Sequence, residues 1–147
     1  MKRLRQLLAL PATSRNLLLK SAFLLLIARL ALACFPFEAL RKRALRFFPP
    51  PNANAPDWLR VETVAWAVDR AALAVGGACL PQALVGEWLL RRSGQAVELR
   101  VGVAKDSEGK LDAHAWLEVD GRTIIGALDE MSRYATFPSL DIPPTGS

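Results

Sequence analysis

The stretch GGACLPQALVGEWLLRRSG, residues 76–94, decides the fold because a helix break, a helix and a helix stop follow one another in it. Gly76-Gly77 ends whatever helix comes before, and Pro81 is tolerated near the start of the next one. The final glycine supplies the stop. The spacing therefore predicts a helix over residues 79–92 that opens at Cys79.

The pattern becomes strand-like directly after this helix. Residues 96–103 mostly alternate apolar and polar side chains, and residues 113–119 and 122–125 are predicted as two further strands. Asp120-Gly121, between the last two, is a typical two-residue hairpin turn. We expect a three-strand antiparallel meander, with a loop from Gly126 onward.

Helical segments are also expected before the glycine break, over residues 17–34, 38–47 and 57–75. The proline-rich run that follows the second segment cannot continue a helix. We therefore predict an α+β fold in three parts: a basic helical N-terminal region (1–50), a Pro-rich linker (51–56) and a core (57–147). In the core, the Cys79 helix packs on a small antiparallel sheet.

The charge is divided between the two halves of the chain. Residues 1–60 carry eleven Lys and Arg against Glu38 and Asp57, a net of +9, whereas residues 61–147 carry eight against twelve acids, a net of −4. A basic front half predicts an acidic partner, a lipid surface or nucleic acid, the alternative being a solvated face. No nucleic-acid-binding motif is present, so no nucleic acid is expected.

The apolar segment from Leu17 to Phe35 contains Lys20 and Arg29. Its uncharged stretches are shorter than the ~20 residues that span a bilayer. We expect a buried or interfacial helix here, with membrane-surface contact as the less favoured alternative.

Two cysteines, Cys34 and Cys79, and one histidine, His114, limit the chemistry. Two distant cysteines make no disulfide framework, and we expect a reducing, cytoplasmic location. One histidine with two distant cysteines predicts no metal site, and no residue calls for an organic cofactor.

Cys79 and His114 are the candidate nucleophile and base. The N–H groups and dipole at a helix start favour a thiolate and can hold an oxyanion. Histidine changes charge near neutral pH, as the base of a thiol must. The alternatives are a small packed cysteine and a surface histidine without a role.

A third group should orient the imidazole. If Val119 pairs with Arg122 across the hairpin, His114 lies opposite Ala127, and Asp129 becomes a diagonal neighbour on the same face. We predict Asp129 as the orienter, with Asp112 and Glu130 as the next candidates. An ordinary loop acid is the alternative.

These residues resemble a known family. Cys79-Leu80-Pro81-Gln82, Val101-Gly102-Val103 and His114-Ala115-Trp116-Leu117-Glu118-Val119 together are similar to the leader-peptide proteases of lasso peptide biosynthesis, within the transglutaminase-like (papain-like) cysteine proteases. Leu32-Ala33-Cys34-Phe35-Pro36-Phe37 also looks like the front end of that family. The resemblance covers most of the chain and implies a transglutaminase-like cysteine protease core over residues 57–147.

The resemblance further implies a Cys-His-Asp leader peptidase acting on a ribosomally made precursor peptide, whose core a macrocyclase then closes. Since residues 1–56 leave no room for a recognition domain, it implies the stand-alone type with a separate leader-recognition protein. Cys79 and His114 carry over. Some relatives have the Asp twelve residues after the His, where this chain has Gly126.

Two other functions remain open. The same Cys-His pair could act as an acyl transferase or deamidase, because both begin from an acyl-enzyme. A non-catalytic basic scaffold or binding protein is the second.

Overall fold

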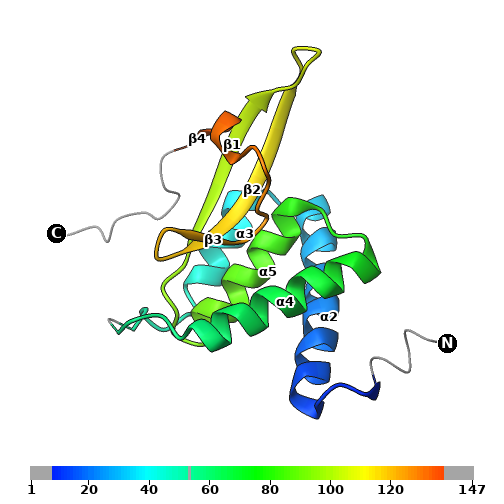
Figure 1. The fold of residues 1–147 in the computed structure, drawn as a ribbon, viewed down its shortest axis with the longest axis vertical. Helices are drawn as coiled ribbons and strands as arrows, with labels where there is room; N and C mark the ends of the chain where they lie inside the picture. The colour runs from blue at the N-terminus through cyan, green and yellow to red at the C-terminus, as the bar shows by residue number, and fades with distance from the viewer. Residues whose placement is uncertain (1–7, 53, 138–147) are drawn as a thin grey trace.

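The computed structural model describes residues 8–52 and 54–137. Helices α2 (Ala12–Cys34), α3 (Phe37–Leu45), α4 (Trp58–Val75) and α5 (Cys79–Arg92) come first (Figure 1). Strands β1 (Glu98–Lys105), β2 (Leu111–Val119) and β3 (Arg122–Ile125) follow. The chain then forms a 3-10 helix, η1 (Met131–Arg133), and a short strand, β4 (Ala135–Thr136). The α+β class predicted from the sequence is confirmed.

The element boundaries show where local signals were sufficient. α5 has the predicted bounds, because glycines and Pro81 mark both of its ends, whereas α2 begins earlier than expected, directly after Pro11. The prediction of a loop from Gly126 onward is wrong for η1 and β4. β4 pairs with β1 through Gly102↔Thr136 and Val103↔Ala135, a long-range pairing that two residues cannot signal in sequence. The predicted loose end beyond residue 137 lies outside the described residues.

The four strands form one antiparallel sheet in the order β3-β2-β1-β4. The predicted hairpin pairing Val119↔Arg122 is confirmed. A bulge then shifts the register, so that Leu117 pairs with Ile125. A bulge adds one unpaired residue to one strand, and the expected pairing of His114 with Ala127 is therefore wrong.

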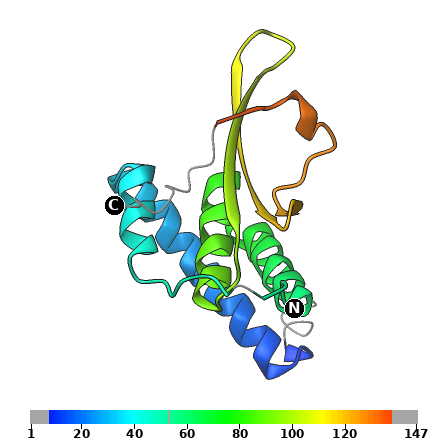
Figure 2. The same ribbon diagram turned by 90° about the vertical axis from the view of Figure 1, so that its left-hand side faces the viewer.

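The helices cover one face of this sheet (Figures 1 and 2). α5 packs on β2 and α4 on β3, while α2 packs on α4 and α5 from behind. Alternate residues of β2, Ala115, Leu117 and Val119, join the helical core. Trp116 points to the other face and packs with Ala104 and Tyr134 in a second, smaller cluster.

α2 belongs to the main core along one side only. Ser21 and Leu25 are completely buried, and Arg29 donates to the carbonyl oxygen of Val75 at the end of α4 (2.7 Å). Within the described residues, α2 is the one helix that is long and apolar enough to cross a membrane. Because its inner side packs on α4 and α5, it shares a core with helices on the far side of the predicted linker. The domain boundary at residues 51–56 stays a prediction.

α3 is attached to α5 by a buried ion pair. The Arg41 guanidinium donates to Glu87 through Nη2 (2.8 Å) and Nε (3.2 Å), and both side chains are about 5% exposed or less. Arg91, one turn further along α5, also donates to Glu87 (3.0 Å). One carboxylate thus joins two guanidinium groups at this helix contact.

We expect Glu87→Ala to lower the free energy of unfolding by about 3–5 kcal/mol, because it removes the carboxylate from a buried guanidinium. Glu98→Ala is the matched control, since Glu98 pairs with Arg100 (2.7 Å) while half exposed, and should cost less than about 1 kcal/mol. Urea unfolding of both variants measures the difference. Equal losses would show that the buried pair does not hold α3.

Candidate active site

The glycine pair brings the start of α5 back onto the end of α4. Gly76 caps α4 with φ +72, and its N–H donates to Ala72. A Cβ on Gly77 would lie 2.7 Å from that of Ala72, so the chain can pass this close to α4 only without a side chain. Cys79 therefore follows directly after a tight return, as the first residue of α5.

Cys79 lies at a helix start that no side chain caps. Ala78 makes no side-chain cap hydrogen bond, and the first turn holds no acidic residue. The N–H groups of Cys79 and Leu80 precede the helical ladder and have no intrahelical acceptor, whereas Pro81 has no N–H to offer. The thiol is half-buried against the core. The free N–H groups can hold the oxyanion of a carbonyl under attack at this position.

The packing of α5 on the sheet sets the level of Cys79 along β2. Gly86 faces Leu117 and Ile125 so closely that a Cβ there would come within 3.1 Å of Leu117 Cδ2. α5 and β2 run in the same direction (Figures 1 and 2). Cys79 is seven residues before Gly86, about 10 Å along a helix, and His114 is three residues before Leu117, about 10 Å along a strand. The two candidates therefore lie at the same level.

His114 projects from the face of β2 that turns away from α5. It alternates with Ala115 and Leu117, which face the helices, and its ring lies 6.0 Å from that of Trp116 and 5.5 Å from that of Tyr134. Two aromatic residues cover part of this side, because Trp116 and Tyr134 are both buried there. No hydrogen bond joins His114 to Cys79 among residues 8–52 and 54–137.

The backbone carbonyl of Gly126 orients His114. His114 Nε2 lies 2.6 Å from this oxygen. A carbonyl can only accept, so Nε2 carries the proton and Nδ1 of the neutral ring keeps its lone pair. Gly126 has φ +79, and a Cβ on it would lie 2.8 Å from the Ala115 carbonyl oxygen. Only glycine therefore fits this backbone and this approach to β2.

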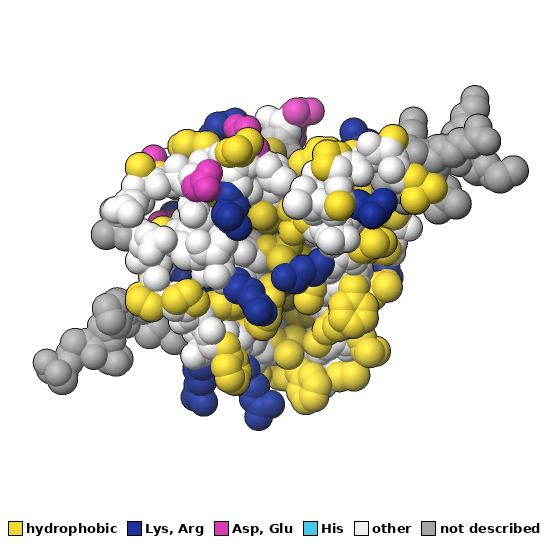
Figure 3. Space-filling model, turned by 90° about the horizontal axis from the view of Figure 1, so that it is seen from below, with side chains coloured by type: hydrophobic (Ala, Val, Ile, Leu, Met, Phe, Trp, Pro, Cys, Tyr) yellow, Lys and Arg dark blue, Asp and Glu magenta, His cyan; other side chains and the backbone are white. Residues whose placement is uncertain are grey.

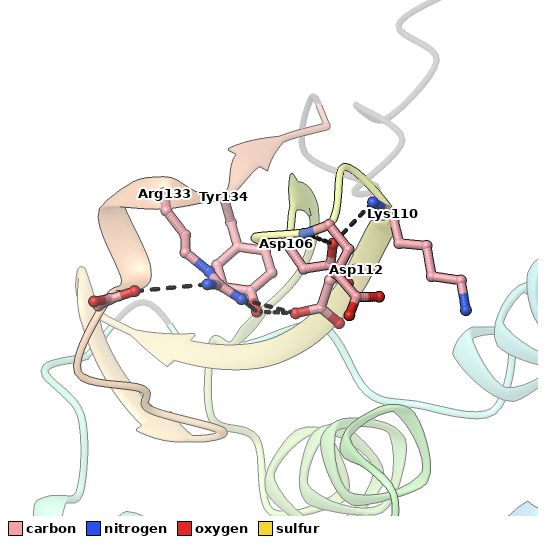
Figure 4. Close-up of polar contacts among 7 residues, drawn as sticks. Asp106, Lys110, Asp112, Arg133 and Tyr134 are labelled. Atoms are coloured by element: carbon pink, nitrogen blue, oxygen red, sulfur yellow. Dashed lines mark hydrogen bonds and ion pairs between the residues drawn. The ribbon is translucent and has the colours of Figure 1, made fainter.

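Tyr134, whose ring lies beside the imidazole, belongs to a polar network with Arg133 and Asp112 (Figure 4). Tyr134 donates its hydroxyl to Asp112 (2.7 Å), and Arg133 donates to the same carboxylate (3.0 Å). The Tyr134 hydrogen bond, helped by Arg133 and by the His114 imidazole, holds the pKa of Asp112 below its ordinary value. The network ties η1 to β2 beside His114.

In the described residues, no hydrogen bond joins Nε2 to the predicted orienter or to its alternatives. Asp129 is exposed in the turn before η1, and within the described ranges no hydrogen bond joins it to His114. Asp112 belongs to the network above, and Glu130 lies 3.6 Å from Arg133 as an ion pair. Gly126 was the missed residue. Its position twelve residues after His114, where some relatives have the Asp, pointed to this place in the chain. The residue type did not, because a backbone carbonyl is common to every residue.

The comparison with protein families supports the fold class. The model described as the transglutaminase-like superfamily matches residues 18–139. The chain belongs to the transglutaminase-like superfamily. The match begins inside α2, before the predicted linker, so it includes the N-terminal helices. No curated protein and no solved structure matches the chain significantly. Since transglutaminase-like proteins are commonly cysteine-type enzymes, often proteases or acyltransferases, this match supports cysteine chemistry but not a particular substrate.

Gly126→Ala should lower the free energy of unfolding of this transglutaminase-like protein by about 1–3 kcal/mol through backbone strain alone. The clash of the new Cβ with the Ala115 carbonyl oxygen should add to this loss. Gly121→Ala is the matched control, because Gly121 has φ +75 but nothing within 4 Å of a Cβ. Urea unfolding should show the larger loss for Gly126→Ala. Equal losses would mean that the approach of Gly126 to β2 is not tight.

Asp112 should make stability depend on acid pH. Because its pKa is lower in the folded chain, the added stability is complete above the unfolded value of about 3.9 and is lost as pH falls through the lowered value. Wild type should therefore exceed Asp112→Asn in unfolding free energy at pH 6, with the gap closing toward the acid end. Asp129→Asn is the control. A gap that is unchanged between these conditions would contradict the role of the network.

Proposed function

We propose that this protein is a cysteine peptidase that removes the leader from a ribosomally synthesised precursor peptide during lasso peptide maturation. Cys79 is the nucleophile and His114 the general base. The observation that carries the chemistry is the 2.6 Å contact between His114 Nε2 and the Gly126 carbonyl oxygen. It selects the tautomer whose Nδ1 can take a proton from a thiol.

The reaction follows from these groups. Nδ1 of His114 accepts the Cys79 proton, and the thiolate attacks the scissile carbonyl carbon. N–H groups at the start of α5 stabilise the oxyanion. The peptide C–N bond then breaks, the released amine takes the proton from the imidazolium, and a thioester remains. Water, deprotonated by the imidazole, hydrolyses this thioester and releases the leader acid.

The thiol and the imidazole must meet for this reaction. They are level along the α5–β2 contact, but the imidazole leaves β2 on the face away from α5. Gly126 lies beside the β2 backbone at Ala115 and Trp116, just beyond the last β2–β3 pairing, so the imidazole bonded to it lies on the β3 side of β2. We place the reacting carbonyl on this side, next to the first turn of α5. The role of Asp129 stays a prediction, and the Gly126 carbonyl supports the proposal without it.

The proposed partners are the precursor leader, a separate leader-recognition protein and a macrocyclase. The basis is the resemblance of the Cys79 and His114 motifs, supported by the superfamily match. The basic N-terminal region, with its net of +9 over residues 1–60, suits an acidic partner. We place the protein in the cytoplasm.

In a Cys34→Ser background, Cys79 should react with iodoacetamide at neutral pH, and His114→Ala should slow the reaction about tenfold or more, because the base is lost. Asp129→Ala is the matched variant and should leave the rate nearly unchanged if Gly126 orients the ring. Mass spectrometry of the alkylated peptide measures each rate. A Cys79 that reacts only after unfolding would overturn the enzyme proposal.

Product mass tests the reaction type. With a precursor peptide and its recognition protein, the wild type should release a leader and a core whose masses sum to the precursor plus one water, and Cys79→Ala should release neither. Joining of two substrates would favour acyl transfer, and conversion of an amide side chain to an acid would favour deamidation. Normal cleavage by Cys79→Ala would exclude Cys79 as the nucleophile.

A further inference from the structure

α2 carries a second apolar face that the fold leaves uncovered. The outer face of α2, as we call it, consists of Leu19, Phe23, Leu26, Ile27 and Leu30. Their spacing of four, three, one and three residues places them along one side of a helix, opposite buried Ser21 and Leu25. Phe23 and Leu30 are 64% and 68% exposed. A soluble helix usually has polar residues on this side, so the face calls for a partner.

The outer face of α2 continues into an apolar hollow. A cavity of about 220 Å³ lies between α2, α3 and α5, and Ile27 belongs both to its wall and to the outer face. Phe48 and Trp88, whose rings meet edge to face at 4.9 Å, line the other side of this cavity. The apolar surface is therefore wider than the ridge of one helix.

The charged residues of α2 and α3 are mostly basic, with Glu38 as the single acidic one. Residues 8–37 contain no Asp or Glu. Lys20 is exposed on α2, and Lys42, Arg43 and Arg46 are exposed on α3. Figure 3 shows this side of the molecule, where hydrophobic side chains gather with Lys and Arg beside them and the visible Asp and Glu lie at the opposite edge. An apolar face with a basic margin is the pattern of helices that lie in the interface of an anionic bilayer.

We propose that the outer face of α2 docks on the surface of an anionic lipid bilayer, with the basic residues of α2 and α3 among the headgroups. The helix lies on the bilayer and does not cross it, because its inner side is part of the protein core. A second copy of the chain fits the surface less well, since it would bring two basic margins together. Because α2 is separated from the sheet by α4 and α5 (Figure 2), the sheet side stays free for substrate. This proposal does not depend on the proposed peptidase activity.

Vesicle flotation of the full chain tests the proposal. The protein should float with vesicles of phosphatidylcholine and phosphatidylglycerol in equal parts, bind weakly to phosphatidylcholine alone, and be released as salt rises. Changing Lys20, Lys42 and Arg43 to Gln should lower the affinity for the anionic vesicles about a hundredfold, because each lost charge lowers it roughly fivefold. The matched control changes Lys105, Lys110 and Arg122, on the sheet side, to Gln and should bind as wild type does.

The apolar contribution has its own pair of variants. Phe23→Ser with Leu30→Ser should reduce binding about a hundredfold, whereas Leu111→Ser with Phe137→Ser, also exposed but on the sheet side, should not reduce it. All four positions are exposed, so the variants should fold, which circular dichroism checks. Equal effects of the two pairs would overturn the proposal.

Cys34 gives a second measurement, because it is exposed and lies one turn beyond Leu30 on the same side. A polarity-sensitive maleimide dye on Cys34, in a Cys79→Ser background, should shift to shorter wavelength with the anionic vesicles. No shift and no flotation would overturn the proposal. So would a dimeric mass by light scattering that Phe23→Ser with Leu30→Ser converts to a monomeric one, because a second copy would then cover the face.

Discussion

The approach of α5 to the sheet at Gly86 determines the geometry of this molecule. A side chain at this position would collide with Ile125 and press on Leu117, so the helix comes this close only because Gly86 has no Cβ. That contact sets how far α5 is displaced along β2. It thereby places the start of α5, and with it Cys79, level with His114. The glycine costs the helix some propensity, which the packing of α5 into the main core offsets.

A second constraint comes from the bulge in the β2–β3 hairpin. The bulge moves Ile125 opposite Leu117, so that the chain after β3 leaves the sheet one residue out of the expected register. Gly126 then turns with positive φ against the β2 backbone, and its carbonyl meets Nε2 of His114. From there the chain crosses the far face of the sheet, where Tyr134 is buried beside Trp116, and forms β4. The imidazole is thus enclosed by a segment that looked like a loop.

The two faces of α2 differ in a way that hydropathy alone does not show. A helix that is apolar all round resembles a membrane span, and α2 passes that test by length and composition. The packing separates its two sides: Leu25 lies in the core, and Phe23 and Leu30 do not. Arg29, which interrupts the apolar run, donates to the last carbonyl of α4 and so helps to hold the turn that leads to Cys79.

Local signals in the sequence determined the helix from Cys79 to Arg92, the Asp120-Gly121 hairpin and the pairing of Val119 with Arg122, because glycines, prolines and periodicity act over a few residues. They also identified Cys79 and His114 as the candidate pair and the transglutaminase-like class. The bulge, strand β4 and the role of the Gly126 carbonyl were decided by tertiary structure. Strand β4 depends on pairing with β1, far earlier in the chain, the bulge changes a pairing inside one hairpin without a local signal, and a backbone oxygen has no identity in the sequence. The expected pairing of His114 with Ala127 was wrong because one extra residue in a strand changes which residues face each other, and the role of Asp129 stays a prediction.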